Sequence, residues 1–99
     1  MKRVVRVLRR AQRDLVEIQT YVWRDNPAAA ERLVEDLLQQ IERLGDLPLR
    51  GALPKDSRLR AAGYRHVARG EYLIFYKVFP SLVRVYRVLH GRRRYQHLL

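Results

Sequence analysis

The chain has 99 residues, 47% of them hydrophobic, and a formal net charge of +11. That length supports one domain with a single modest core. The absence of cysteine excludes disulfides and thiolate metal sites, and it suits a reducing cytosol. No apolar run is long enough to span a membrane, and Arg6, Arg9 and Arg10 interrupt any signal-peptide core, so we expect a soluble cytoplasmic protein.

The positive charge is concentrated in the second half of the chain. Residues 50–99 contain 12 Lys/Arg against 2 acids, a net of +10, whereas residues 1–49 contain 9 against 8, a net of +1. The basic half is also rich in Tyr, Val and Leu, which favours a sheet with a cationic surface. Such a surface suits an anionic partner: nucleic acid, a nucleoprotein or an acidic protein segment.

The first half predicts a strand followed by a helical hairpin. Residues 3–8 are short and β-branched, as in a strand. A helix follows from Arg10, because the apolar residues then recur at helical spacing. A second helix is predicted to begin at Asn26-Pro27, a good N-cap before a favoured first residue, and to end at Gly45. The apolar faces of the two helices are Ala11, Leu15, Ile18 and Val22, and Ala30, Leu33, Val34, Leu37, Ile41 and Leu44.

The second half predicts a loop and three strands. Residues 46–63 contain several Pro and Gly and no helical or strand period, so we interpret them as a connecting loop. Residues 64–69, 72–79 and 82–90 alternate as strands do and are separated by tight turns. The order β-α-α-β-β-β predicts an α+β fold, in which an antiparallel sheet carries the N-terminal helical hairpin on one face and the single domain spans residues 1–99.

Alternation along the strands predicts a cationic surface on the face that the helices leave open. Strand residues two apart share a face, so Arg65 and Arg69 project together. Arginine's planar fork also suits phosphate and carboxylate. We expect one continuous surface for an anionic target or partner, made of Arg58, Arg60, Arg65, Arg69, Arg84, Arg87, His90, Arg92, Arg93, Arg94 and Tyr95.

Other conspicuous side chains have structural interpretations. Tyr21 and Trp23 lie beside the aliphatic stripe of the first helix, where core packing is favoured over an exposed contact. Asp14 is expected on an exposed helical face, and Tyr95 is expected to pack against the domain. The histidines lack acidic or cysteine partners at ligand spacing, so we expect no metal site and no cofactor.

An ordered set of short motifs extends over nearly the full length. It comprises Ala11…Asp14-Leu15…Ile18…Tyr21, Asn26-Pro27…Ala30…Leu33, Ile41…Leu44…Pro48…Gly51, Gly63-Tyr64-Arg65, Ile74-Phe75-Tyr76-Lys77-Val78 and Arg87-Val88-Leu89-His90-Gly91-Arg92-Arg93. In these motifs the chain resembles the RelE/ParE superfamily of toxins from type II toxin–antitoxin pairs. The resemblance implies a compact toxin neutralised by an antitoxin that wraps it, and hence an oligomer with that acidic partner.

Two activities occur in this superfamily. RelE-like members are ribosome-dependent mRNA interferases, which need an acid, a base and cations around one phosphate. In this chain the candidates for that alternative are Arg65, Arg87, His90 and Tyr95. ParE-like members act without catalysis by trapping DNA gyrase on cleaved DNA.

The catalytic set of the RelE-like members is incomplete here. Val67, Leu73 and Gly91 stand where the resemblance implies basic residues. We therefore favour a ParE-like toxin that targets gyrase, with a ribosome- and mRNA-directed nuclease as the alternative. A non-toxic basic nucleic-acid-binding protein is the third interpretation, and it predicts steeply salt-dependent binding to free DNA or RNA.

Overall fold

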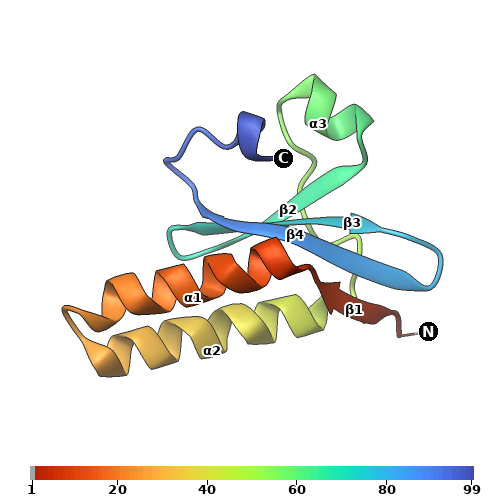
Figure 1. The fold of residues 1–99 in the computed structure, drawn as a ribbon. Coiled ribbons are helices and arrows are strands. Elements are labelled where there is room, and N and C mark those ends of the chain that lie inside the picture. Colours follow the sequence, from red (N-terminus) through yellow and green to blue (C-terminus); the bar gives the residue numbers. More distant parts are fainter. Residues whose placement is uncertain (1) are drawn as a thin grey trace.

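A computed structural model describes residues 2–99 and confirms the predicted class and order of elements. Two short helices were not predicted, one in the loop and one near the C-terminus (Figure 1). The elements are β1 (Val4–Val7), α1 (Arg9–Trp23), α2 (Pro27–Arg43), α3 (Ser57–Ala61), β2 (Tyr64–Arg69), β3 (Tyr72–Val78), β4 (Leu82–His90) and the 3₁₀ helix η1 (Gln96–Leu98). No helix in this described part is both long and apolar enough to cross a membrane.

The four strands form one sheet in the order β1-β4-β3-β2. The predicted antiparallel pairing is found between β2 and β3 and between β3 and β4, but β1 runs parallel to β4. A parallel pair requires a long crossover, and here the helical hairpin and the rest of the sheet lie between the two strands in the chain. The sheet is therefore mixed, and β1 is one of its edges (Figure 1).

Helix α2 begins and ends close to where its capping residues predict. The Asn26 side chain accepts a hydrogen bond from the Ala29 amide at 3.1 Å, with Pro27 at the first helical position. Gly45 follows α2, although its backbone is not left-handed. A Cβ there would lie 2.7 Å from the Arg3 carbonyl oxygen, so the glycine is needed because β1 passes so close.

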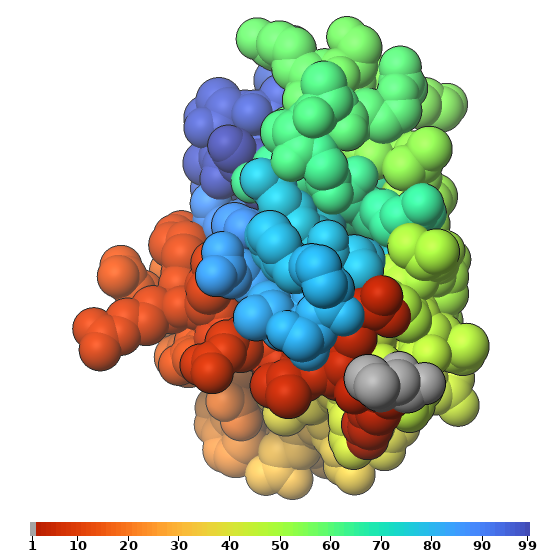
Figure 2. All heavy atoms as spheres, turned by 90° about the vertical axis from the view of Figure 1, so that its right-hand side faces the viewer, coloured from red at the N-terminus to blue at the C-terminus, as the bar shows by residue number. Residues whose placement is uncertain are grey.

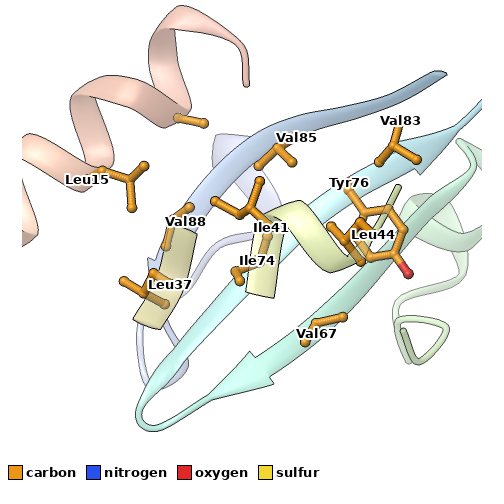
Figure 3. Close-up of a cluster of buried hydrophobic side chains, with 11 residues drawn as sticks. Leu15, Leu37, Ile41, Leu44, Val67, Ile74, Tyr76, Val83, Val85 and Val88 are labelled. Atoms are coloured by element: carbon orange, nitrogen blue, oxygen red, sulfur yellow. The ribbon is translucent and has the colours of Figure 1, made fainter. Parts of the chain in front are cut away.

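The main core lies between the helical hairpin and one face of the sheet (Figure 3). Leu15 of α1 and Leu37 of α2 pack there against strand residues such as Ile74 and Val85. Tyr21 and Trp23 were expected to join this packing, and that prediction was wrong. They are 71% and 47% exposed, because the buried stripe of α1 lies on the side of Ala11 and Leu15.

The opposite face of the sheet is partly covered, contrary to the prediction of an open face. Leu59 of α3 packs with Tyr64, Phe75 and Leu89, and the C-terminal segment adds Tyr95, Leu98 and Leu99 to this second cluster. The Asp56 carboxylate caps α3 by accepting hydrogen bonds from the Arg58 and Leu59 amides, at 2.8 and 3.2 Å. Figure 1 shows α3 and the C-terminal segment on the side of the sheet away from α1 and α2.

A bulge in β4 changes which side chains share a face. Tyr76 of β3 pairs with Val85, whereas the preceding Phe75 pairs with Arg87, so Tyr86 is the extra residue. Before the bulge, odd-numbered residues of β4 face the helices; after it, even-numbered residues do. The simple alternation that grouped Arg87 with Val85 was wrong for this reason.

Candidate functional site

Arg87 is an interior residue that joins three parts of the chain. Its guanidinium donates to both carboxylate oxygens of Asp14, at 2.8 and 3.0 Å, and to the Leu98 carbonyl at 3.2 Å. The same Asp14 carboxylate accepts the Val88 amide at 3.0 Å. Asp14 is 3% exposed and Arg87 5%, so the predictions of an exposed Asp14 and of Arg87 in a binding surface were both wrong.

Arg65 and Arg69 do share a face of β2, but it is the face toward α2. Arg65 is paired across the sheet with the core residue Tyr76, and its guanidinium donates to the Gly51 carbonyl at 2.9 Å. Arg69 forms an ion pair with Asp36 of α2 at 2.6 Å. That hydrogen bond and the charge of Asp36 raise the pKa of Arg69. Both guanidinium groups therefore bind the chain itself.

The loop arginines Arg58 and Arg60 belong to α3, on the same side of the sheet as the second cluster, whereas Arg93 of the tail lies beside Ile18 and Tyr21 of α1. Arg58 is exposed, and Arg60 donates to the Pro54 carbonyl at 3.0 Å. Arg92, Arg93 and Arg94 are exposed just beyond β4. The Tyr95 ring packs 4.8 Å from that of Phe75, centroid to centroid, which confirms the prediction that Tyr95 packs against the domain.

His90 lies at the end of β4 and faces the helical side. Its ring is 3.4 Å from the Glu71 carboxylate and edge-on to Tyr72, while its Nδ1 accepts the Arg92 amide at 3.2 Å. It borders a groove of about 570 Å³ between α1 and the ends of β3 and β4, into which the exposed Tyr21 also projects. Burial, and then the nearby Glu71 charge, raise the pKa of Tyr72 in this groove.

These positions do not form the single continuous surface that was predicted. Arg65 and Arg69 lie on one face, Arg84 and Tyr95 on the other, and Arg87 is inside. Alternation gave the shared face of Arg65 and Arg69 correctly. It could not tell which face the helices cover.

Sequence reasoning missed a line of cations on the part of the second face that the C-terminal segment leaves open. Arg6 of β1 is in register with Arg84 of β4, which is in register with Lys77 of β3. We call these three residues the cationic row. Strand neighbours are about 4.8 Å apart, so the row spans roughly 10 Å. Finding the row requires knowing that β1 pairs in parallel with β4 and in which register, and neither can be predicted from the sequence pattern.

Aromatic rings support two members of the row. The Lys77 ammonium lies over the rings of Tyr64 and Tyr86, 4.4 and 5.0 Å from their centroids, and the Arg84 guanidinium lies 4.7 Å from the centroid of Phe79. Within residues 2–99, no carboxylate forms an ion pair with any of the three cations. Figure 2 shows β1 (red) beside the β3–β4 end of the sheet (cyan to blue) at the surface.

The outer edge of β1 is a second exposed feature. The amides of Val4 and Leu8 bond to carbonyls at the β4 side, at 3.3 and 3.0 Å, so alternation turns the polar groups of Val5 and Val7 away from the sheet. The Gln12 side chain donates to the Val7 carbonyl at 2.8 Å. The other edge of the sheet is partly closed, because Ala52 exchanges two backbone hydrogen bonds with His66 of β2.

The candidates for RNA cleavage are divided between the two faces of the sheet. Arg65 and His90 lie on the helical side with their strand partners Tyr76 and Tyr72, whereas Tyr95 packs on the opposite side against Phe75. Arg87 is occupied by Asp14. One phosphate cannot contact all four groups in this arrangement. In the described residues, no group of three or more His, Asp or Glu side chains is placed to hold a metal ion.

Comparison with known proteins identifies the family. Residues 5–95 match the family model described as the ParE toxin of the type II toxin–antitoxin system parDE, and the chain belongs to this family. It is 39% identical over 88 residues to the toxin ParE1 of Caulobacter vibrioides, covering 86% of this chain and 85% of that protein. It is 31% identical over 88 residues to the toxin RelE3 of the same organism, covering 86% of this chain and 90% of that protein.

Solved structures support the same fold. A chain of the chromosomal ParDE toxin–antitoxin system from P. aeruginosa superimposes with a TM-score of 0.74 at 20% identity, covering 90% of this chain and 96% of that one. A chain of the toxin–antitoxin complex RelBE2 from Mycobacterium tuberculosis gives a TM-score of 0.69 at 26% identity, covering 91% and 92%. The chain is therefore a type II toxin of the ParE/RelE superfamily.

Proposed function

We propose that this toxin inhibits growth by acting on DNA gyrase without catalysis and that a cognate acidic antitoxin neutralises it. The observation that carries the first part is the division of the nuclease candidates between two faces of the sheet. Cleavage of RNA requires a base, an acid and cations around one phosphate. Tyr95 and His90 lie on opposite sides of the sheet, and Arg87 is held inside by Asp14.

The positions that lack the expected basic residues support the same proposal. Val67 is 6% exposed in the main core, and Leu73 packs in the second cluster. Val67 is therefore turned into the core, and the half-buried Leu73 packs on the face opposite to Arg65 and His90, so neither position adds a cation beside those two candidates.

The proposed antitoxin contact combines charge with an exposed strand edge. An acidic, partly disordered segment suits a chain of net charge +11. The outward backbone groups of Val5 and the outward amide of Val7 on β1 offer hydrogen bonds to an added strand, next to the Val7 carbonyl that the Gln12 side chain already occupies. The exposed Tyr21 beside the groove on α1 provides an aromatic anchor for an apolar segment.

Purified toxin and purified gyrase test the target directly. Relaxed plasmid, gyrase and ATP are incubated with increasing toxin, with and without the antitoxin from the neighbouring gene. We expect loss of supercoiling and accumulation of cleaved plasmid, both reversed by the antitoxin. Normal supercoiling at saturating toxin would contradict the gyrase target.

The alternative target is tested in parallel, because one relative at 31% identity is named RelE3. Messenger RNA ends are mapped in a translation extract that contains the same toxin preparation. We expect no toxin-dependent ends. Ends that depend on both toxin and ribosomes would establish the nuclease instead, and the variant His90→Gln would then show whether that imidazole takes part.

A further inference from the structure

The cationic row has the properties of a binding site for an anion that the chain does not supply. Like charges placed directly opposite on neighbouring strands repel one another and destabilise a sheet. Arg6, Arg84 and Lys77 are nevertheless in one register line, with no ion-pairing carboxylate in the described residues. An external polyanion bound along the row would relieve this repulsion.

The row is also separated from the exposed arginines of the C-terminal tail, Arg92, Arg93 and Arg94. Arg84 lies near the beginning of β4 and Arg92 beyond its end, so at about 3.3 Å per residue they are roughly 25 Å apart along the strand. The row therefore has to be considered as a site of its own rather than as part of the tail.

We propose that the cationic row binds the phosphate backbone of duplex nucleic acid. Three cations spaced over roughly 10 Å match a run of neighbouring phosphates, and two of the three are solvent-exposed arginines. Within residues 2–99, no ion-pairing carboxylate occupies any of the three, and aromatic rings lie against Lys77 and Arg84 without neutralising their charge. This binding goes beyond the proposed action on gyrase and requires neither gyrase nor antitoxin.

The aromatic residues of this face favour a duplex over a single strand. Proteins that bind single strands offer free aromatic faces on which bases stack. Here the rings of Tyr64 and Tyr86 are occupied by Lys77 and by their own edge-to-face contact, and the Phe79 ring is occupied by Arg84. A duplex needs no stacking platform, since it presents only its backbone.

The same face is poorly suited to a protein partner. Stable protein interfaces are centred on apolar or aromatic anchors. Of the large apolar side chains that are strongly exposed in residues 2–99, Val4 is the only one that belongs to a strand of the sheet. The cationic row, rather than an apolar anchor, lies at the centre of this face, as in sequence-independent contacts with phosphates.

Binding to a labelled DNA duplex, measured over a range of salt concentrations, tests the proposal. Each phosphate contact contributes about 0.9 to the slope of log affinity against log salt. The variant R6Q/K77Q/R84Q should therefore lower that slope by about 2.7 and weaken binding at about 0.1 M salt by at least tenfold. The matched control R24Q/R32Q/R43Q removes the same charge from exposed positions on the helical layer, and its slope should fall by less than about 1.

Three outcomes would overturn the proposal and one would support it. Equal losses in the two triple variants would overturn it, since binding would then follow net charge alone. Tighter binding to a single strand than to a duplex would also overturn it, as would displacement by polyglutamate at the same charge concentration as duplex. Similar slopes on DNA and RNA duplexes would support it.

Folding of the variants is checked by circular dichroism. If the triple variant does not fold, the single variants Arg6→Gln and Arg84→Gln should each lower the slope by about 0.9, and slopes unchanged from wild type would overturn the proposal. Failure of this experiment leaves the gyrase assay unaffected, so the two proposals fail separately.

Discussion

Arg84 and Arg87 lie three residues apart on β4 and have opposite environments. Arg84 is exposed on a ring face with no carboxylate partner in the described residues, whereas Arg87 is 5% exposed and bonded to Asp14. The difference arises from the bulge at Tyr86 and from what lies opposite each side chain. Asp14 of α1 binds Arg87, which therefore joins the helix to β4. Within the described residues no carboxylate binds Arg84, so its charge is available to a partner.

The largest effect should come from breaking the interior pair. Asp14→Ala leaves the Arg87 guanidinium buried without its counterion and the Val88 amide without its acceptor. We expect a loss of about 3–5 kcal/mol in the free energy of unfolding, measured by urea denaturation. The exposed Glu17→Ala on the same helix is the control, and it should cost less than about 0.5 kcal/mol.

A double variant sharpens this prediction. Asp14→Leu with Arg87→Met replaces both charges by apolar groups, so it should cost less than the sum of the two single changes. Additive costs would show that Asp14 and Arg87 stabilise the fold independently of each other.

The second prediction concerns a buried hydroxyl under the loop. Tyr76 is fully buried, accepts the Gly51 amide at 2.9 Å and donates to the Pro48 carbonyl at 2.7 Å. Tyr76→Phe should lower the free energy of unfolding by about 1–3 kcal/mol, because the buried Gly51 amide loses its acceptor. Tyr21→Phe is the matched control at a 71% exposed position, and a similar loss there would contradict the account.

The third prediction concerns the pH dependence of stability that arises from His66, which lies on the second-cluster face of the sheet. Burial lowers the pKa of His66, which packs against Phe75, so the folded chain binds this proton less readily than the unfolded chain. Stability should therefore decrease as the pH falls from about 6.5 toward the lower folded pKa. Unfolding curves at several pH values check this, and His66→Gln should reduce the pH dependence; an unchanged dependence in that variant would contradict the prediction.

The smallest effect on the free energy of unfolding is expected when a cation of the cationic row is removed. Removing like charges that face one another should leave the free energy of unfolding unchanged or raise it, by up to about 1 kcal/mol for Arg84→Gln. Denaturant unfolding at low and high salt measures this change. A loss of more than about 1 kcal/mol would show that Arg84 stabilises the chain as Arg87 does.

The sequence was sufficient for the elements that depend on local patterns. Apolar spacing and the Asn26-Pro27 cap placed both long helices, and short alternating runs placed the three C-terminal strands. The five-residue helix after Asp56 was missed, because a short helix has little apolar period and its single buried residue, Leu59, gives no pattern.

Properties that depend on pairing could not be predicted. A bulge adds one residue to β4 and leaves no mark in its composition, yet it decides that Arg87 and Val88 exchange faces. The partner of Arg87 is 73 residues away in the chain, and the register of Arg6 on Arg84 depends on an edge strand running parallel to β4. These contacts determine which cations are available for binding.

The salt dependence of duplex DNA binding by Arg84→Gln and Arg87→Met tests this division of the cations most directly. We expect the slope to fall by about 0.9 for Arg84→Gln and to stay at the wild-type value for folded Arg87→Met, which loses stability instead. An equal fall of the slope in folded Arg87→Met and in Arg84→Gln would contradict this division.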